Sequence, residues 1–310
     1  MTREYNGKDW AAADGRGRMD PQLTELYAQP YLIQAPAEQR VPFVFASPHS
    51  GRIYPQSFLR LSRLSALSLR RSEDAYVDEL FSGVVGLNAP LIAARFPRAW
   101  LDANRGPGEL DTSMFDAPLP MAVETAGPRV AAGLGVIPRI VRDGADIYRT
   151  KLPPDDAERR LVLHRRYHAA LSLLVRETME RFGTAVIIDC HSMPSVPGAP
   201  DIVLGDRYGT AASNALLRQA EQAFRARGFN MGRNVPYAGG YTTQLYGQPK
   251  RGIHALQVEI NRALYLDEEP IEPIANFAAL SERLLAALNE LTKIDPTLLR
   301  TRNHLRVAAE

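Results

Sequence analysis

Short apolar segments with a strand-like composition alternate along this chain with segments of helical periodicity. The segments expected to form strands are residues 41–47, 91–96, 100–101, 184–190, 201–204 and 254–260. Those expected to form helices are residues 73–86, 155–182, 211–227 and 272–292. Such alternation is typical of an α/β sheet with helices on both of its faces.

The composition is that of a globular protein with a sizeable core. Hydrophobic residues make up 45% and charged residues 23% of 310 residues. No internal repeat or shift in composition divides the chain, so we expect a single α/β domain over residues 31–300. A loose polar extension is expected over residues 1–30.

Charge and cysteine content exclude several classes of protein. The formal net charge is +2, and the basic residues around 159–166 fall in a helical segment, where a solvated face is expected rather than nucleic-acid binding. Cys190 is the single cysteine, which excludes an intrachain disulfide and a cysteine-rich zinc site. The charged first 25 residues do not resemble a signal peptide, and no run of 18 apolar residues could span a membrane. We therefore expect a cytoplasmic protein.

Polar residues able to do chemistry lie at or just beyond the ends of the apolar segments. They are His49, Asp102, Asn104, Arg105, Asp189, His191 and Glu259. In open α/β sheets, ligands bind beyond the carboxyl ends of the strands. Four separate segments can thus direct reactive groups to one site.

Two of these residues suggest a metal. His49 and His191, with a nearby carboxylate, would give a mononuclear zinc site that keeps one position for water, whose pKa falls to about 7. Structural alternatives exist for each histidine. His49 could be a loop residue packed against Pro48, and His191 could be a core residue hydrogen-bonded to the backbone.

Other patterns are weaker. His164 and His168 are four residues apart in a helical segment, but they lack the glutamate that a zinc-protease helix carries between its histidines. Cys190 and His191 are neighbours on a strand and therefore point to opposite faces. No nucleophile elbow surrounds a serine, and no phosphate-binding P-loop occurs.

Five motifs, in this order, together resemble the N-formylglutamate amidohydrolases. They are SPHSGRIYP (47–55), RSEDAYVDELF (71–81), LDANR (101–105), IDCHS (188–192) and GGYTTQLYGQPKRGIHALQVEINR (239–262). The resemblance implies a three-layer α/β/α fold with a mixed, mostly parallel central sheet, of the phosphorylase/hydrolase-like type found in zinc carboxypeptidases and aspartoacylase.

The resemblance also implies an activity. N-formyl-L-glutamate and water would give formate and L-glutamate, a reaction of histidine degradation. The substrate would be a small N-acyl amino acid. Two alternatives are a metal-dependent deacylase or carboxypeptidase-like hydrolase of other N-acyl amino acids, and a non-catalytic small-acid-binding protein on the same fold. The acyl group, the native metal, the oligomeric state and the role of loops 106–154 stay open.

Roles for single residues follow from the resemblance. His49 and His191 would bind zinc together with Asp74. Asp74 is chosen because ED-x-x-x-D matches the aspartate position of the family, and Glu73 is the alternative acidic ligand. The carboxypeptidase H-x-x-E spacing is missing, because Arg52 stands where it would place a glutamate. Glu259 would be the general base.

Substrate binding and support involve further residues. Asn104 and Arg105 would bind a substrate carboxylate, since a guanidinium pairs with a carboxylate through two parallel hydrogen bonds. N-formylglutamate has two carboxylates, so a second cation is expected, with Arg251 and Arg262 as candidates. Asp102 and Asp189 are expected to support the site from behind, and Asp189 could instead bond a nearby backbone N–H.

Strand alternation supports the role of Glu259. Gln257, Glu259 and Asn261 would share one face of their strand and line the site, whereas Leu256, Val258 and Ile260 would pack on a helix. The structural alternative for Glu259 is an ion pair with Arg262 or Arg251.

Overall fold

The computed structural model describes residues 20–141 and 143–300, which form two compact units interleaved along the chain. Unit 1 consists of the described residues up to Leu32, with Gly51–Glu73 and Ala94–His168. Unit 2 consists of Ile33–Ser50, Asp74–Ala93 and the described residues from Ala169. The segment predicted as one domain, residues 31–300, contributes residues to both units, because the chain crosses between them several times.

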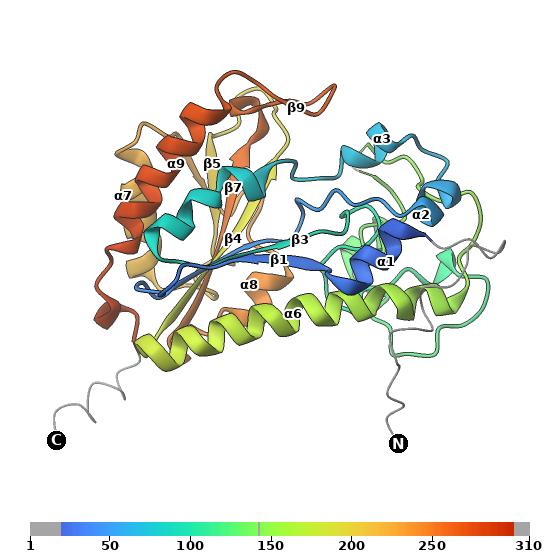
Figure 1. The fold of residues 1–310 in the computed structure, drawn as a ribbon, viewed down its shortest axis with the longest axis horizontal. Coiled ribbons are helices and arrows are strands. Elements are labelled where there is room, and N and C mark those ends of the chain that lie inside the picture. The colour runs from blue at the N-terminus through green and yellow to red at the C-terminus, as the bar shows by residue number, and fades with distance from the viewer. Residues whose placement is uncertain (1–19, 142, 301–310) are drawn as a thin grey trace. The chain divides into compact units, whose positions relative to one another are not determined.

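A seven-stranded sheet organises unit 2 and has the order β1-β3-β2-β4-β7-β5-β6 (Figure 1). Its strands are β1 (Tyr31–Gln34), β2 (Phe43–Ser47), β3 (Leu91–Ala94), β4 (Ala185–Met193), β5 (Ile202–Gly205), β6 (Met231–Arg233) and β7 (Ile253–Asn261). Strand β2 pairs in parallel with β3 and β4, β4 with β7, and β5 with β6, whereas β5 runs antiparallel to β7. The predicted mixed, mostly parallel sheet is confirmed.

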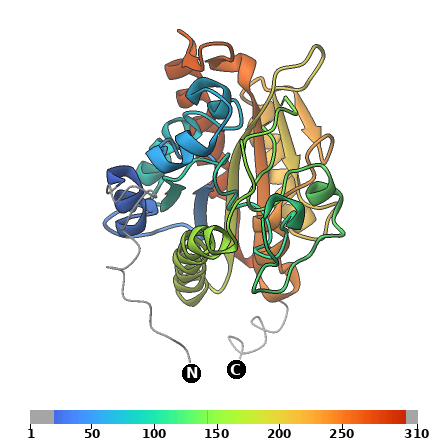
Figure 2. The same cartoon turned by 90° about the vertical axis from the view of Figure 1, so that its right-hand side faces the viewer.

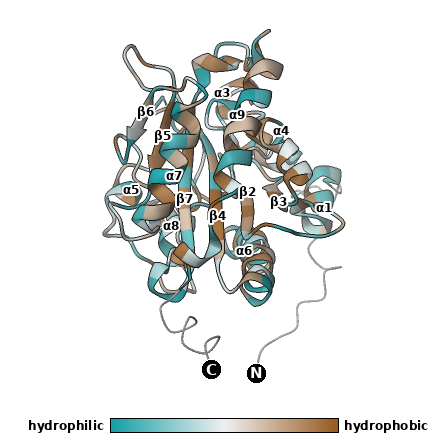
Figure 3. Ribbon diagram, turned by 90° about the vertical axis from the view of Figure 1, so that its left-hand side faces the viewer, coloured by the Kyte–Doolittle hydropathy of each residue, from teal (hydrophilic) through white to brown (hydrophobic). Residues whose placement is uncertain are grey.

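Helices cover both faces of this sheet. Helices α7 (Asn214–Arg225) and α9 (Phe277–Thr292) pack on one face, where their apolar side chains join those of the strands in the main core. Helix α8 (Tyr241–Tyr246) and the second half of α6 (Pro154–Phe182) lie on the other face (Figures 1 and 2). The central strands β2 and β4 are mostly hydrophobic (Figure 3), as expected for strands buried on both faces.

Helix α6 begins one residue before the predicted start, residue 155, and ends at the predicted residue, Phe182. Asp155 and Asp156 lie in its first turn, where carboxylates interact favourably with the helix dipole. Gly183 follows its last residue with a φ of +68°, the left-handed conformation that ends many helices.

The helix predicted at residues 73–86 is broken into α4 (Val77–Leu80) and the 3-10 helix η1 (Ser82–Leu87). Tyr76, at φ 62°, precedes α4 in the left-handed conformation. Gly83 and Gly86 in this segment have low helix propensity, which accounts for the short elements. Glu73 and Asp74 therefore precede the helix, in the turn that leads to it.

The prediction of a loose extension over residues 1–30 is wrong for residues 21–28, which form a helix. Residues 1–19 lie outside the described residues. Helix α1 (Pro21–Ala28) starts at a proline, and the Asp20 side chain accepts a hydrogen bond from Leu23 N at 3.2 Å. The other carboxylate oxygen of Asp20 accepts two more, from the backbone N and the Oγ of Ser57, both at 2.7 Å. These bonds order the start of the described chain.

Unit 1 carries the remaining short elements, α2 (Gln56–Leu61), α3 (Ala66–Arg70), η2 (Thr112–Met114) and α5 (Pro128–Ala131). The strand predicted at residues 100–101 is a turn, because Trp100 N and Leu101 N both donate to Pro97 O, at 2.9 and 3.1 Å. Arg160 is fully buried and donates to Trp100 O at 2.9 Å and to Tyr148 Oη at 2.6 Å. A charged side chain of α6 thus ties together loops that lack regular structure.

The other elements of unit 2 are η3 (Pro249–Arg251), η4 (Arg262–Leu264), the two-stranded sheet of β8 (Leu266–Asp267) and β9 (Glu272–Pro273), and η5 (Pro296–Leu298). Within the part of the chain that the structure describes, none of the helices combines the length and hydrophobicity needed to cross a bilayer.

Candidate metal centre and active site

The register of β4 and β7 determines which polar side chains lie next to one another in the candidate site. Asp189 pairs with Gln257, and His191 pairs with Glu259, in a parallel ladder. Side chains alternate along each strand, and residues such as Cys190 belong to the core beneath α7 and α9. The four polar side chains therefore share the opposite face. The predicted alternation of core-facing and site-facing side chains along β7 is confirmed.

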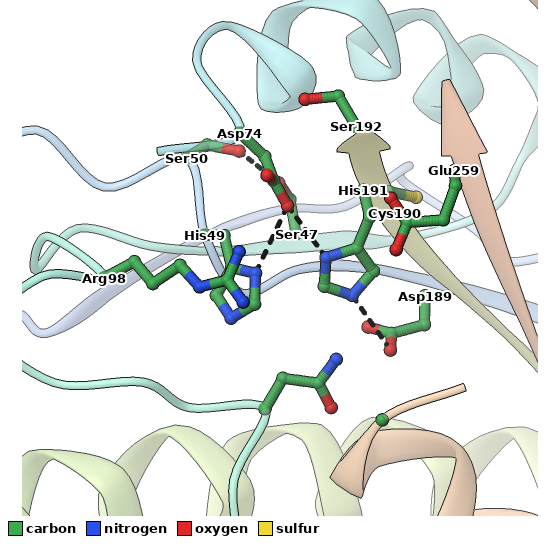
Figure 4. Close-up of polar contacts among 12 residues, drawn as sticks. Ser47, His49, Ser50, Asp74, Arg98, Asp189, Cys190, His191, Ser192 and Glu259 are labelled. Carbon is green, nitrogen blue, oxygen red and sulfur yellow. Dashed lines mark hydrogen bonds and ion pairs between the residues drawn. The ribbon is translucent and has the colours of Figure 1, made fainter. Parts of the chain in front are cut away.

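Three side chains converge beside the end of β4 (Figure 4). Asp74 Oδ2 lies 2.8 Å from His191 Nδ1 and 3.2 Å from His49 Nδ1. His49 follows β2 and Asp74 precedes α4, and the two segments are joined by a hydrogen bond from Asp74 N to His49 O of 3.1 Å. All three side chains are buried, and one ligand atom from each lies within 4.8 Å of the others. Among the described residues this is the one such group of three.

A second carboxylate lies behind His191. The Nε2 atom of His191 is 3.0 Å from Asp189 Oδ2, on the far side of the ring from Asp74 (Figure 4). Burial lowers the pKa of His191, but the charge and hydrogen bond of Asp189 and the hydrogen bond of Asp74 outweigh it, so the pKa is raised well above its ordinary value. A carboxylate bonded to one ring nitrogen commonly orients the other nitrogen toward a metal.

Asp74 is held as an anion. Burial opposes its ionisation, but the hydrogen bonds to His191 and His49 outweigh burial and set its pKa well below the ordinary range. Its second oxygen, Oδ1, accepts from Arg262 Nη2 at 3.0 Å.

This donor set suits a divalent transition metal. Two imidazole nitrogens and one carboxylate oxygen are the three protein ligands of many catalytic zinc sites, which keep a fourth position open. Their burial and their convergence in one small volume meet the requirement for a tight site.

The proposed base is also oriented by a neighbour. Glu259 is 5% exposed, and its Oε1 accepts from Gln257 Nε2 at 2.7 Å. Gln257 Oε1 in turn accepts from Gly240 N at 2.8 Å, just before α8. Strand alternation predicted that Gln257 shares a face with Glu259, but the contact itself depends on the loop at Gly240.

Glu73, the alternative acidic ligand, is engaged elsewhere in unit 1. Its carboxylate accepts from Tyr54 Oη at 2.6 Å and from Arg70 Nε at 3.2 Å. Burial raises its pKa, against the lowering effect of Tyr54 and Arg70. This geometry favours Asp74 over Glu73 as the ligand.

Neither Arg251 nor Arg262, the two candidates for a second substrate-binding cation, lies where the sequence led us to expect it. Arg251 is exposed in η3, donates to Gln248 Oε1 at 2.9 Å, and precedes the start of β7. About 20 Å of strand separates that start from Glu259. Arg251 therefore lies at the wrong end of β7 to bind a substrate beside Glu259. Arg262 is buried and bonded to Asp74.

Asn104 and Arg105 lie buried in a loop of unit 1. Asp102 Oδ1 accepts from Asn104 N at 2.8 Å, so Asp102 shapes this loop. Arg105 donates to Leu134 O and Asn104 O, at 3.0 and 2.8 Å. Burial lowers its pKa to about 10, which leaves the guanidinium charged at neutral pH.

The two histidines of α6, His164 and His168, contact the backbone of this loop. His164 Nε2 lies 2.9 Å from Arg105 O, and His168 Nε2 lies 2.8 Å from Ala103 O. Both rings thus bond backbone carbonyls of the loop.

The fold and the site define a class of protein, an α/β protein whose mixed sheet carries a buried His-Asp-His group, able to bind a metal, near its carboxyl strand ends. The model of the family described as N-formylglutamate amidohydrolase matches residues 41–266. The chain belongs to the N-formylglutamate amidohydrolase family, as its motifs predicted.

Proteins named as N-formylglutamate deformylase or N-formylglutamate amidohydrolase are similar to this chain. An N-formylglutamate deformylase of Pseudomonas aeruginosa is 30% identical over 264 residues, which cover 81% of this chain and 91% of that protein. One from Pseudomonas putida is 28% identical over 268 residues, with the same coverage. The crystal structure of N-formylglutamate amidohydrolase from Ralstonia eutropha JMP134 is similar at a TM-score of 0.79 and 32% identity, covering 87% of this chain and 98% of that one.

Proposed function

We propose that this protein is a zinc-dependent amidohydrolase that converts N-formyl-L-glutamate and water to formate and L-glutamate. Family membership supports the reaction class. The observation that carries the proposal is the convergence of His49 and His191 on one oxygen of Asp74, with Glu259 in register beside His191.

The metal would be held by His49 Nδ1, His191 Nδ1 and Asp74 Oδ2. A zinc ion bound by these three residues would supply an activated water and polarise the substrate carbonyl. Asp189 fixes the His191 ring from its Nε2 side, so that Nδ1 keeps its direction when the metal is absent.

Glu259 would move the proton. Its carboxylate accepts a proton from the attacking water as the new C–O bond to the formyl carbon forms, and it returns this proton to the amide nitrogen as the formyl C–N bond breaks. Gln257 holds Oε1 of Glu259, which fixes the direction of the carboxylate. Burial keeps competing water away from this group.

Arg105 would bind a substrate carboxylate, with Asn104 beside it. Its Nε and Nη1 bond backbone carbonyls, which fixes the plane of the guanidinium, so Nη2 and the second hydrogen of Nη1 would pair with the carboxylate. A planar fork held in this way suits a carboxylate better than a flexible ammonium does.

The test combines metal analysis with a substrate panel. The purified protein is expected to contain about one zinc per chain, to lose activity with a chelator, and to lose its metal in His191→Ala. His254→Gln is the matched histidine control, because His254 lies at the other end of β7, and it should keep the metal.

The panel separates the alternatives. N-formylglutamate, N-acetylglutamate and N-acetylaspartate are offered under the same conditions. Preference for the formyl compound supports the proposal, whereas faster hydrolysis of an acetyl compound indicates a deacylase. Binding of these acids without hydrolysis in the zinc-loaded protein would indicate a binding protein. An enzyme whose activity survives complete removal of metal would refute the proposed zinc dependence.

A further inference from the structure

We infer that Arg262 is a positioning residue for the metal ligand Asp74, and that it does not bind the second carboxylate of the substrate. This inference rests on the proposed function, because it assumes that Asp74 binds zinc. It explains a buried guanidinium that the reaction itself does not use.

Arg262 and the two histidines contact different oxygens of Asp74. Its Nη2 donates to Oδ1 at 3.0 Å, while Oδ2 faces His191 Nδ1 at 2.8 Å and His49 Nδ1 at 3.2 Å. A carboxylate bonded in this way cannot rotate freely about its last side-chain torsion. One oxygen is thus kept in the direction of both histidines before any metal arrives.

The guanidinium is itself fixed from two other segments. Arg262 Nε donates to Ser192 Oγ at 3.1 Å, next to His191 in sequence. Arg262 Nη1 lies 3.6 Å from Glu268 Oε2. Glu268 Oε1 accepts from Ser195 N and Ser195 Oγ, at 2.8 and 2.7 Å.

Each guanidinium nitrogen therefore has a partner within the protein. Turning the fork toward a substrate would break these contacts in a side chain that is only 4% exposed. A substrate cation needs donors directed into the site, whereas the donors of Arg262 are directed at Asp74, Ser192 and Glu268. The geometry fits support of a ligand and does not fit capture of a second carboxylate.

Charge balance gives Arg262 a second effect on Asp74. The carboxylates of Asp74, Asp189 and Glu259 are all buried on this side of the sheet. A guanidinium bonded to Asp74 offsets part of this negative charge. Lysine would keep the charge but, with a single nitrogen, could not reproduce the planar set of three contacts.

The experiment measures zinc affinity directly. Apo-protein is titrated with zinc against a chromophoric chelator for the wild type, Arg262→Lys, Arg262→Met and the control Arg225→Met, an exposed arginine of α7. We expect the zinc Kd to rise by about 10- to 100-fold in both Arg262 variants, the usual effect of losing a residue that orients a ligand. At saturating zinc, the KM for N-formylglutamate should stay close to that of the wild type. Arg225→Met should change neither quantity.

Other outcomes overturn the inference in distinguishable ways. An unchanged zinc Kd with a raised KM would make Arg262 a substrate cation after all. If both quantities are unchanged and only the melting temperature falls, Arg262 merely stabilises the fold. A wild type that binds no zinc refutes the proposed function itself.

Glu268→Gln keeps the test possible if the Arg262 variants do not fold. Glu268 is 23% exposed, and the buried Arg262 guanidinium keeps its bond to Asp74 when Glu268 is changed. We expect a two- to fivefold rise in the zinc Kd, about the scale of a partly exposed ion pair. In an Arg262→Lys background that folds, Glu268→Gln should add little, because both act through the same guanidinium. Full additivity, or an unchanged Kd in Glu268→Gln when the Arg262 variants cannot be made, would contradict the inference.

Discussion

Replacing Glu259 by glutamine tests the proposed proton transfer with little change in shape. The side-chain amide oxygen of glutamine can accept the bond that Gln257 Nε2 now donates to Glu259 Oε1 at 2.7 Å. Glutamine is also uncharged, so it removes one of the buried carboxylates beside His191. The folded structure and the metal ligands should therefore persist.

The expected loss is kinetic. General acid–base catalysis typically contributes about 10²- to 10⁴-fold, so Glu259→Gln should lower kcat by that factor. This corresponds to roughly 2.7–5.4 kcal/mol of barrier, at about 1.36 kcal/mol for each factor of ten. The hydrogen bond to Gln257 is retained, so the stability should change by no more than about 1 kcal/mol.

The assay measures formate release at saturating N-formylglutamate, together with zinc content and melting temperature. Glu282→Gln, an exposed glutamate on α9, is the matched control and should behave as the wild type. A near-normal kcat in Glu259→Gln would place the base elsewhere. Loss of zinc from this variant would show that Glu259 is a ligand, and the division of roles among the carboxylates would be wrong.

Three further predictions concern Asp189, Arg105 and His254. Asp189→Asn should weaken zinc binding by about 10- to 100-fold in a chelator competition, because the amide holds the His191 ring less firmly than the carboxylate; an unchanged Kd would remove Asp189 from this role. Arg105→Lys should raise the KM for N-formylglutamate by more than it lowers kcat, since ground-state binding is lost as well, and steady-state kinetics with an unaltered KM would exclude Arg105 from substrate binding. Burial lowers the pKa of His254 below its ordinary value of 6.5, despite its bond to Leu299 O. The unfolded chain therefore binds more protons, so the contribution of His254 to stability is present above pH 6.5 and is lost as the pH falls from there toward the folded-state pKa. Melting curves of the metal-free protein should show a shallower acid loss in His254→Gln than in the wild type, and parallel curves would argue against this linkage.

The sheet and the longest helix were predictable because their signals are local. The run at residues 184–190 is apolar apart from Thr184 and Asp189 and forms most of β4, and Gly183 marked the end of α6. The alternation of β7 also separated its core face from its polar face correctly. These features depend on periodicity and on single residues with strong conformational preferences.

The contacts within the site depend on segments far apart in sequence. Arg262 was a candidate for the substrate because it is a cation close to Glu259 along the chain, yet its main partner, Asp74, is 188 residues away. Arg251 was chosen for the same reason and lies at the opposite end of the strand. Sequence proximity does not show which end of a strand faces the site. Likewise, the motif favoured Asp74 and kept Glu73 as the alternative, but the direction of each carboxylate depends on the turn before α4, which the motif does not describe.

The pairing of β4 with β7 links correct folding to correct chemistry. Main-chain hydrogen bonds place His191 directly opposite Glu259, and the same ladder turns Val258 and Ile260 into the core. A slip of one residue would move Glu259 out of the site and would also expose those apolar side chains to the polar face. Any pressure to keep the protein stable therefore also preserves the alignment of the proposed base with the proposed metal ligand, and loops away from this ladder can change substrate preference without disturbing it.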